Sequence, residues 1–165
     1  MRAIILAAGL GTRLGKYTEN KPKCMLEFMG KTLIERQVET IRKLGIRDII
    51  IIKGHFGEKI NLKGVKYVEW SGPETNMVPD LFEAENYFGD GFIMVYGDVL
   101  FDEETFKRVM NCNKDVCVTV DDNWKEYWRA RFNGNIDDVE SVQISQRGDI
   151  FELGTPNCPI EDCHA

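Results

Sequence analysis

The stretch RAIILAAGLGTRLGKYTENKPKCM, residues 2–25, joins a continuous apolar run to a long polar loop. Residues 2–8 contain one charged side chain, which is typical of a strand buried on both faces of a parallel sheet. The following loop contains two close glycines, Gly9 and Gly11, and four cations. The sequence therefore predicts that a buried strand carries a cationic glycine loop at its carboxyl end.

The rest of the chain alternates apolar runs with amphipathic segments. Thr32 and Glu35 form a potential capping box for a helix that ends at Gly45. Further helices are predicted at 56–62, 78–87 and 102–110, and strands at 48–52, 66–70, 92–96, 116–120, 140–144 and 150–153. This order predicts an α/β fold in one domain, residues 1–165. Its sheet is Rossmann-like and mixed but mainly parallel, with helices on both faces.

Composition excludes several protein classes. No stretch approaches the roughly 18 apolar residues of a membrane span, so we expect no membrane partner. The five cysteines are odd in number and scattered, which favours reduced thiols and a cytoplasmic protein. The grouping of Cys158, Cys163 and His164 does not have a usual zinc spacing, and surface thiols are the simpler interpretation.

Charge is unevenly distributed along a chain whose net charge is −6. Residues 1–31 hold six Lys or Arg against two Glu, whereas residues 67–106 hold ten acids and no Lys or Arg. This separation fits a site that holds an anion and a divalent metal, but charge alone favours two ordinary solvated surfaces. Nucleic-acid binding is not expected, because the cations are confined to one loop of an acidic chain.

The glycine loop fits neither of the two common phosphate-binding motifs. A Rossmann fingerprint needs a third glycine where Leu14 stands. A P-loop needs four residues between its glycines and Ser or Thr after the lysine, but Gly11 and Gly15 enclose three residues and Tyr17 follows Lys16.

The loop nevertheless has the chemistry of a phosphate site. Gly9 and Gly11 allow backbone N–H groups to approach an anion closely. Arg13 offers a planar fork for phosphate oxygens, and Pro22 restricts the backbone before Lys23. The alternative is a flexible surface loop with solvated cations.

The stretches LAAGLGTRL and TENKPKCML resemble the G-x-G-x-R…P-K signature of the sugar-phosphate nucleotidyltransferase superfamily. The resemblance continues through KTLIERQVETIRKLGIRDIIII and YGDVLFD, and TNMVPDLFEAENYF resembles the phosphocholine cytidylyltransferase branch. It covers residues 1 to about 155 and implies the nucleotide-diphospho-sugar transferase type of fold. It also implies that the chain lacks a C-terminal part, in which the family places a second metal-binding acid.

The resemblance assigns roles to individual residues. Arg13 and Lys23 are the expected catalytic residues, and Asp98 is expected to bind Mg²⁺. The residues expected to bind the nucleotide are Leu6, Ala7, Ala8, Gly9, Gly11, Thr12 and Asn76. Two alternatives stay open, since Asp98 could cap a helix and Asn76 could be a turn residue.

An aromatic segment, DDNWKEYWRAR, provides candidates for binding the acceptor. Asp121, Trp124 and Trp128 combine carboxylate and aromatic groups that suit an ammonium group, and Arg129 suits a phosphate or phosphonate. The alternative is an amphipathic helix that buries its aromatic side chains.

The resemblance implies a Mg²⁺-dependent nucleotidyltransferase. CMP from CTP would pass to a small acceptor such as phosphocholine, phosphoethanolamine or an aminoalkylphosphonate, with release of pyrophosphate. A sugar-1-phosphate nucleotidyltransferase using CTP or UTP is an alternative, as are a nucleotide-binding module without turnover and a flavodoxin-like interaction domain. A homo-oligomer is compatible with the sequence.

Overall fold

The computed structural model describes residues 1–70, 72, 76–132 and 141–154. The chain divides into two compact units, Met1–Lys114 and Asp115–Ala165. Each unit is described by itself below.

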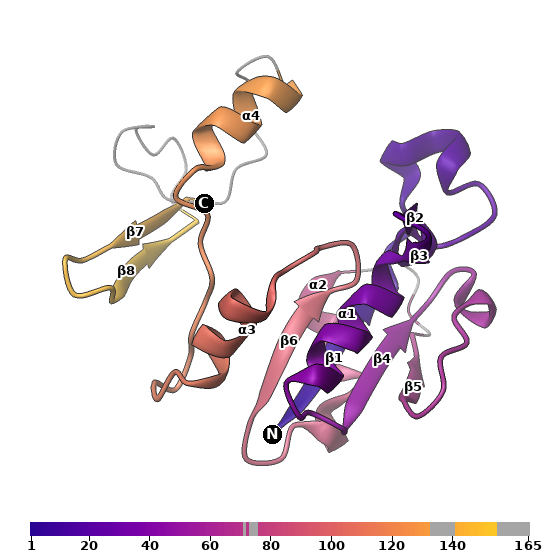
Figure 1. Cartoon of the computed structure of the whole chain (residues 1–165), viewed down its shortest axis with the longest axis horizontal. Helices are drawn as coiled ribbons and strands as arrows, with labels where there is room; N and C mark the ends of the chain where they lie inside the picture. The colour runs from indigo at the N-terminus through magenta and orange to yellow at the C-terminus, as the bar shows by residue number, and fades with distance from the viewer. Residues whose placement is uncertain (71, 73–75, 133–140, 155–165) are drawn as a thin grey trace. The chain divides into compact units, whose positions relative to one another are not determined.

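The first unit is built on a four-stranded parallel sheet. Its strands are β1 (Arg2–Ala7), β4 (Ile49–Lys53), β5 (Lys66–Glu69) and β6 (Phe92–Tyr96), in the order β5-β4-β1-β6 (Figure 1). After β1 the chain adds β4 and β5 on one side of that strand, and it then adds β6 on the other side. The carboxyl ends of β1 and β6 therefore flank the point where the strand order reverses, which is where open α/β sheets bind their ligands.

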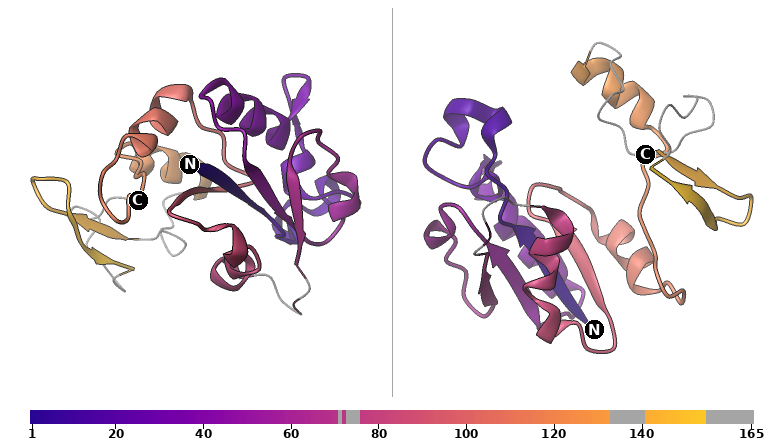
Figure 2. Two further views of the ribbon diagram at one scale, coloured as in Figure 1. Left: turned by 90° about the horizontal axis from the view of Figure 1, so that it is seen from below. Right: turned by 180° about the vertical axis from the view of Figure 1, so that it is seen from behind.

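Helices cover both faces of this sheet, as predicted. Alternate residues of each strand point to opposite faces. One face packs against α1 (Leu33–Lys43) and α3 (Glu103–Met110), and the other packs against α2 (Met77–Phe82) and η4 (Glu85–Tyr87). Figure 2 shows α1 and α3 on one side of the strands and α2 on the other. The continuous apolar runs reflect this double coverage, because Ile49, Ile50, Ile51 and Ile52 are all 0–1% exposed.

The predicted capping box of α1 is confirmed. The Thr32 side chain accepts a hydrogen bond from the Glu35 N–H, and the Glu35 carboxylate accepts from the Thr32 N–H. The helix ends before Gly45, whose φ of +91° lies in the left-handed region. This box fixes the start of the helix that lies over β1.

Short elements connect the main ones. The glycine loop contains η1 (Thr12–Tyr17) and η2 (Lys23–Met25), and a small ribbon of β2 (Glu27–Phe28) and β3 (Lys31–Thr32) leads into α1. The helix expected at 56–62 is a single 3₁₀ turn, η3 (Gly57–Lys59). The helix expected at 78–87 consists of α2 and η4, two short pieces.

The second unit contains α4 (Trp124–Phe132) and a hairpin of β7 (Val142–Ile144) and β8 (Ile150–Leu153). The strand predicted at 116–120 is wrong: these residues are in no strand, and Val116 is 80% exposed. Alternating valines favour a strand only where a neighbouring strand pairs with them, and none does here among the described residues.

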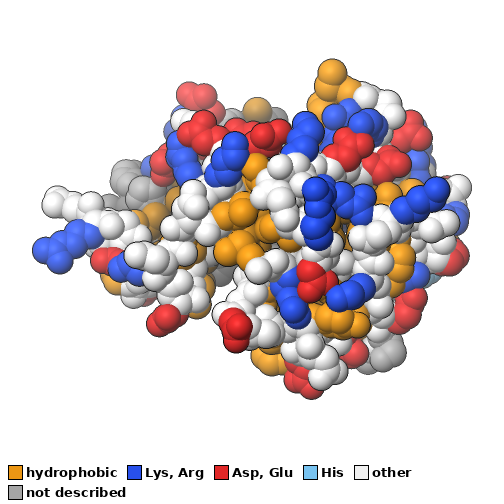
Figure 3. All heavy atoms as spheres, turned by 60° about the horizontal axis from the view of Figure 1, so that its bottom comes forward, with side chains coloured by type: hydrophobic (Ala, Val, Ile, Leu, Met, Phe, Trp, Pro, Cys, Tyr) orange, Lys and Arg blue, Asp and Glu red, His pale blue; other side chains and the backbone are white. Residues whose placement is uncertain are grey.

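Two further expectations concern the chain as a whole. The expectation of reduced thiols is wrong for Cys112 and Cys117, which are disulfide-bonded, because an odd and scattered set of cysteines can still form disulfides in the folded chain. None of the described helices combines the length and apolar character needed to cross a bilayer. Figure 3 shows Lys and Arg side chains interspersed with Asp and Glu on the face that it displays.

Candidate active site

A cavity of about 360 Å³ lies at the carboxyl ends of β1 and β6. The end of β1 and its loop contribute Leu6, Ala7, Ala8 and Gly9 to its wall. The remaining lining residues come from the glycine loop, α2 and the end of β6: Arg13, Lys23, Cys24, Met77, Asp80, Tyr96, Gly97 and Asp98. Segments far apart in sequence thus meet where the strand order reverses.

The glycine loop is folded back on itself rather than freely extended. Gly11 has a φ of +70°, and a Cβ there would come within 3.0 Å of Lys23 Cγ. The buried Thr18 hydroxyl donates to the carbonyl oxygens of Gly11 at 2.8 Å and Gly15 at 3.2 Å. Because Gly11 packs beneath Lys23, it does not line the cavity, whereas the exposed Gly9 does.

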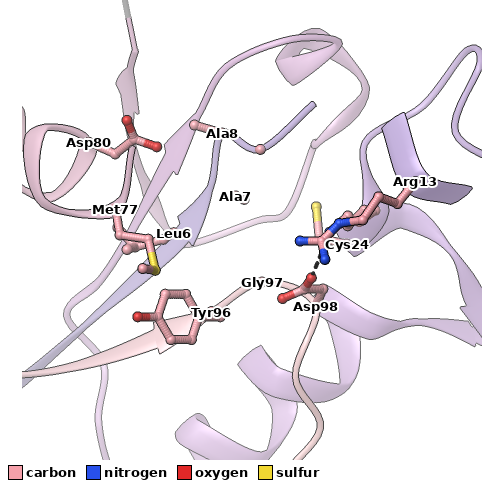
Figure 4. A pocket seen from close by; sticks show the side chains of 12 residues that line it. Leu6, Ala7, Ala8, Arg13, Cys24, Met77, Asp80, Tyr96, Gly97 and Asp98 are labelled. Atoms are coloured by element: carbon pink, nitrogen blue, oxygen red, sulfur yellow. Dashed lines mark hydrogen bonds and ion pairs between the residues drawn. The ribbon is translucent and has the colours of Figure 1, made fainter. Parts of the chain in front are cut away.

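The two predicted catalytic cations and the predicted metal ligand lie at one end of the cavity. Lys23 Nζ is 3.2 Å from Asp98 Oδ2, and both side chains are partly exposed. Pro22 has an extended backbone and directly precedes the short helix η2. Its restricted backbone therefore fixes where this helix begins, and Lys23 is the first residue of the helix. Figure 4 shows Arg13 reaching toward the end of the cavity where Asp98 lies, away from Asp80 and Met77.

A tight turn after β6 holds Asp98 in place. The Gly97 N–H donates to Leu6 O at 2.8 Å, and the Val99 N–H donates to Tyr96 O at 3.2 Å. A Cβ on Gly97 would lie 3.0 Å from Leu6 O, which explains the glycine before the aspartate. The helix cap of α3 is Asp102, whose Oδ1 accepts from the Thr105 N–H at 2.7 Å, so capping does not account for Asp98.

Asp98 suits a magnesium ion that arrives with a nucleotide. Among the described residues, no three His, Cys, Asp or Glu side chains gather to form a complete cation site. Magnesium keeps several waters and typically binds one or two carboxylates together with substrate phosphates. A single carboxylate beside Arg13 and Lys23 is compatible with that shared mode of binding.

Asp80 lies at the opposite end of the cavity and was missed in the sequence. It is 5% exposed, and its Oδ1 accepts a hydrogen bond from the Asn76 N–H at 3.0 Å. Burial raises the pKa of its carboxyl, and the nearby charge of Glu83 adds to that effect. The Asn-x-x-x-Asp spacing could have indicated that these two residues meet across the first turn of a helix.

Asn76 itself starts α2. Its side-chain oxygen accepts from the Val78 N–H at 3.4 Å, and the residue is exposed outside the cavity wall. This geometry agrees with the turn-residue alternative, and binding of the base by Asn76 stays a prediction. Thr12 lines a second cavity, of about 320 Å³, with His55 and Phe56.

Cys24 forms part of the cavity wall, but its thiol is unreactive. The residue is 2% exposed, and burial raises the pKa of its thiol to about 12, with a further contribution from the charge of Asp98. The thiol is therefore protonated at neutral pH and is neither a nucleophile nor a metal ligand in that form.

The residues predicted to bind the acceptor all belong to the second unit. Trp124 is 3% exposed, and its ring packs edge-on against Trp128 with centroids 6.4 Å apart. Asp121 accepts from the Asn123 N–H at 2.8 Å, and Arg129 is exposed. These contacts agree with a helix that packs its aromatic side chains together, and the acceptor role stays a prediction.

Comparison with known proteins gives a consistent picture. Residues 3–141 match the family of MobA-like NTP transferase domains. Over 93% of its length the chain is 30% identical to a CTP:phosphoglutamine cytidylyltransferase of Campylobacter jejuni, of which it spans 65%. It therefore spans slightly less than two thirds of that relative.

Two solved structures are also similar. The CTP:phosphocholine cytidylyltransferase of Streptococcus pneumoniae matches 62% of the chain and 49% of its own length, with 34% identity and a TM-score of 0.51. The inositol-1-phosphate CTP transferase of T. maritima matches 93% of the chain and 63% of its own length, with 21% identity and a TM-score of 0.71. At that identity the second likeness concerns the fold alone, and it confirms the predicted fold class.

Proposed function

Because the chain belongs to the MobA-like NTP transferase domain family, we propose that it transfers a nucleoside monophosphate to a small phosphorylated acceptor and releases pyrophosphate. The proposed donor is CTP, and the proposed acceptor is phosphocholine, phosphoethanolamine or a similar aminoalkyl phosphate or phosphonate. The names of the Campylobacter and Streptococcus relatives both support CTP as the nucleotide, and the name of the Streptococcus relative supports phosphocholine as the acceptor.

One observation carries the proposal: Arg13, Lys23 and Asp98 converge on one end of a cavity between β1 and β6. Opposite charges 75 positions apart in sequence are brought to 3.2 Å. As a partly exposed pair they contribute little to stability, at most about 1 kcal/mol. Two cations and a carboxylate together supply what a triphosphate with its metal needs.

The chemistry requires positioning and charge stabilisation more than proton transfer. An oxygen of the acceptor phosphate attacks the α-phosphorus, the bond to the β-phosphate oxygen breaks, and pyrophosphate leaves. The attacking oxygen is already anionic at neutral pH, so no general base is needed, and the protonated Cys24 thiol would not provide one. The difficulty lies in bringing two anions together and stabilising the charge that develops.

The cations have distinct roles in this proposal. Arg13 binds the β- and γ-phosphates with its planar fork, and the backbone at Gly9 assists. Lys23 contacts the α-phosphate and the incoming acceptor as a mobile point charge. Asp98 would hold Mg²⁺, which supplies further neutralisation of phosphate charge when bound.

At the other end of the cavity, Asp80 is the residue that would contact the base in this proposal. One of its oxygens is engaged by the Asn76 N–H. The other can accept from an exocyclic amine of cytosine or from a ring N–H of uracil. Asp80 therefore offers an acceptor to an N–H group of the base without choosing between CTP and UTP.

Pyrophosphate release over a grid of nucleotides and acceptors tests the proposal. The grid contains CTP and UTP against phosphocholine, phosphoethanolamine, 2-aminoethylphosphonate and glucose 1-phosphate. We expect turnover with CTP and an aminoalkyl acceptor, and its loss in Arg13→Ala. Lys16→Ala removes a cation of the same loop that lies outside the cavity wall, and should leave turnover unchanged.

Other outcomes would contradict specific parts of the proposal. Turnover with glucose 1-phosphate alone would show that the acceptor is a sugar 1-phosphate and not an aminoalkyl phosphate or phosphonate. Nucleotide binding without turnover for any pair would favour a binding module. Equal nucleotide affinity in the wild type and Arg13→Ala would overturn the assignment of the cavity.

A further inference from the structure

Gln37 is a buried polar residue on the face of α1 that packs against the sheet. It is 1% exposed, and its neighbours on the same helix face, Ile34, Val38 and Ile41, belong to the apolar core. An amide in such surroundings destabilises the fold unless it is hydrogen-bonded. Its partners therefore indicate why a polar side chain stands there.

Those partners are the two ends of the turn that carries Asp98. Gln37 Nε2 donates to Tyr96 O at 2.7 Å and also to Val99 O. Tyr96 O accepts in addition from the Val99 N–H at 3.2 Å, using the second lone pair of the carbonyl. One amide group thus clamps both ends of a turn whose middle residues are Gly97 and Asp98.

The orientation of the amide follows from its surroundings. Both partners are carbonyl oxygens, which can only accept, so the NH₂ group must face the turn. Gln37 Oε1 is buried and has no hydrogen-bond partner within the part of the chain that the structure describes. The two donated hydrogen bonds are consequently the polar contacts that offset burial of this side chain.

The clamp joins α1 to the turn that carries Asp98. Gln37 lies in the second turn of α1, beyond the capping box, and the packing of Ile34, Val38 and Ile41 in the core holds this part of the helix against the sheet. On the other side, the Gly97 N–H ties the same turn to Leu6 of β1. Asp98 therefore stands on a turn that is held from the helix layer and from the sheet.

We propose that Gln37 is a positioning residue that sets the place of the Asp98 carboxylate for binding the metal–triphosphate. This inference rests on the proposed function. Without the amide, the carbonyls of Tyr96 and Val99 lose their buried donor and the turn can rotate. A shift of about 1 Å in a reacting constellation can lower a rate by about 100-fold.

The test uses Gln37→Met, which keeps the length and removes the donors. In the ligand-free protein, amide hydrogen exchange of Gly97 and Val99, followed by NMR, should accelerate by about tenfold, because the turn has lost two of its hydrogen bonds. Mn²⁺ binding in the presence of the α,β-methylene analogue of CTP, measured by EPR, should weaken by about tenfold. Binding of the analogue without metal should change by less than about twofold, since Gln37 does not line the cavity.

Two further variants make the result specific. Thr32→Ala removes the cap of α1 without touching the turn, and it should lower the melting temperature but leave Mn²⁺ affinity and exchange at Val99 unchanged. Gln37→Glu replaces the donors with carboxylate oxygens that face two carbonyls, and its effects on exchange and on Mn²⁺ should equal or exceed those of Gln37→Met.

Several outcomes would overturn the proposal. Unchanged exchange at Gly97 and Val99 in both Gln37 variants would show that the amide does not hold the turn. Faster exchange with unaltered Mn²⁺ affinity would assign Gln37 a structural role alone. If the wild type binds no Mn²⁺ with the analogue, the proposed function fails, while the exchange data still decide whether Gln37 fixes the turn.

Discussion

Lys23 and Asp98 form an ion pair that contributes little to the stability of the fold. Their side chains are 27% and 43% exposed, so solvent screens the attraction between them. Each charge keeps the other close to the place where phosphate and metal are proposed to bind. We expect both to exchange this contact for ligand contacts during the reaction.

Removal of the lysine should therefore separate activity from stability. Lys23→Ala is expected to lower pyrophosphate release by about 100-fold, the scale of losing one charge-stabilising donor. The melting temperature should stay close to that of the wild type. Lys16→Ala is the matched control, and equal activity of the two variants would contradict the role of Lys23.

The Asp80 carboxyl makes the free energy of unfolding of the protein depend on pH. Burial raises its pKa in the folded protein above the value of 3.8 that it has when exposed. Folding therefore disfavours the ionised form, and this penalty applies at neutral pH and fades as the pH falls toward 3.8.

The corresponding variant is Asp80→Asn, whose side-chain oxygen can still accept from the Asn76 N–H. It should unfold at a higher temperature than the wild type at pH 7, and the difference should shrink as the pH is lowered. Asp90→Asn, which removes an exposed carboxylate before β6, controls for net charge. A difference between Asp80→Asn and the wild type that does not vary with pH would contradict this account.

The elements around the cavity differ in how far the sequence predicted them. The strands β1, β4 and β6 were predicted because burial on both faces leaves a continuous apolar run. Residues 116–120 have the alternating valines typical of a strand, but within the described part of the chain no strand pairs with them, and only tertiary structure reveals this. Sequence motifs identified three site residues, Arg13, Lys23 and Asp98. The hydrogen bond between Gln37 and Tyr96 joins residues 59 positions apart, so no local sequence pattern could have predicted it.

The turn after β6 offers a test at the level of a single element. Gly97→Ala places a Cβ 3.0 Å from Leu6 O and 3.3 Å from Ala7 Cβ, so the end of β6 must shift from β1. We expect a lower melting temperature together with loss of nucleotide binding. Gly9→Ala meets nothing within 4 Å and should fold normally, which makes it the matched control. Equal melting temperatures would contradict the close packing of the turn.

The molecule as a whole combines an acidic chain with a local group of cations. Its net charge is −6, and the described cavity lies entirely within the first unit. The family match, residues 3–141, extends from that unit into the second. In the proposed function, local cations would therefore hold the nucleotide against the electrostatic repulsion of the whole chain.

This balance predicts how salt affects binding. Raising NaCl from about 50 to about 500 mM should weaken CTP binding, because the contacts of Arg13 and Lys23 with phosphate are screened. Calorimetric titration of Arg13→Ala should give a shallower dependence on salt than the wild type. A steeper or unchanged dependence would show that Arg13 does not contact the triphosphate.

The most direct test of the central claim is an NMR titration of the ¹⁵N-labelled chain with CTP and Mg²⁺. The account predicts that the largest shifts occur at Gly9, Lys23, Gly97 and Asp98, around the cavity between β1 and β6. Shifts confined to His55 and Phe56, which line the other cavity, would contradict it.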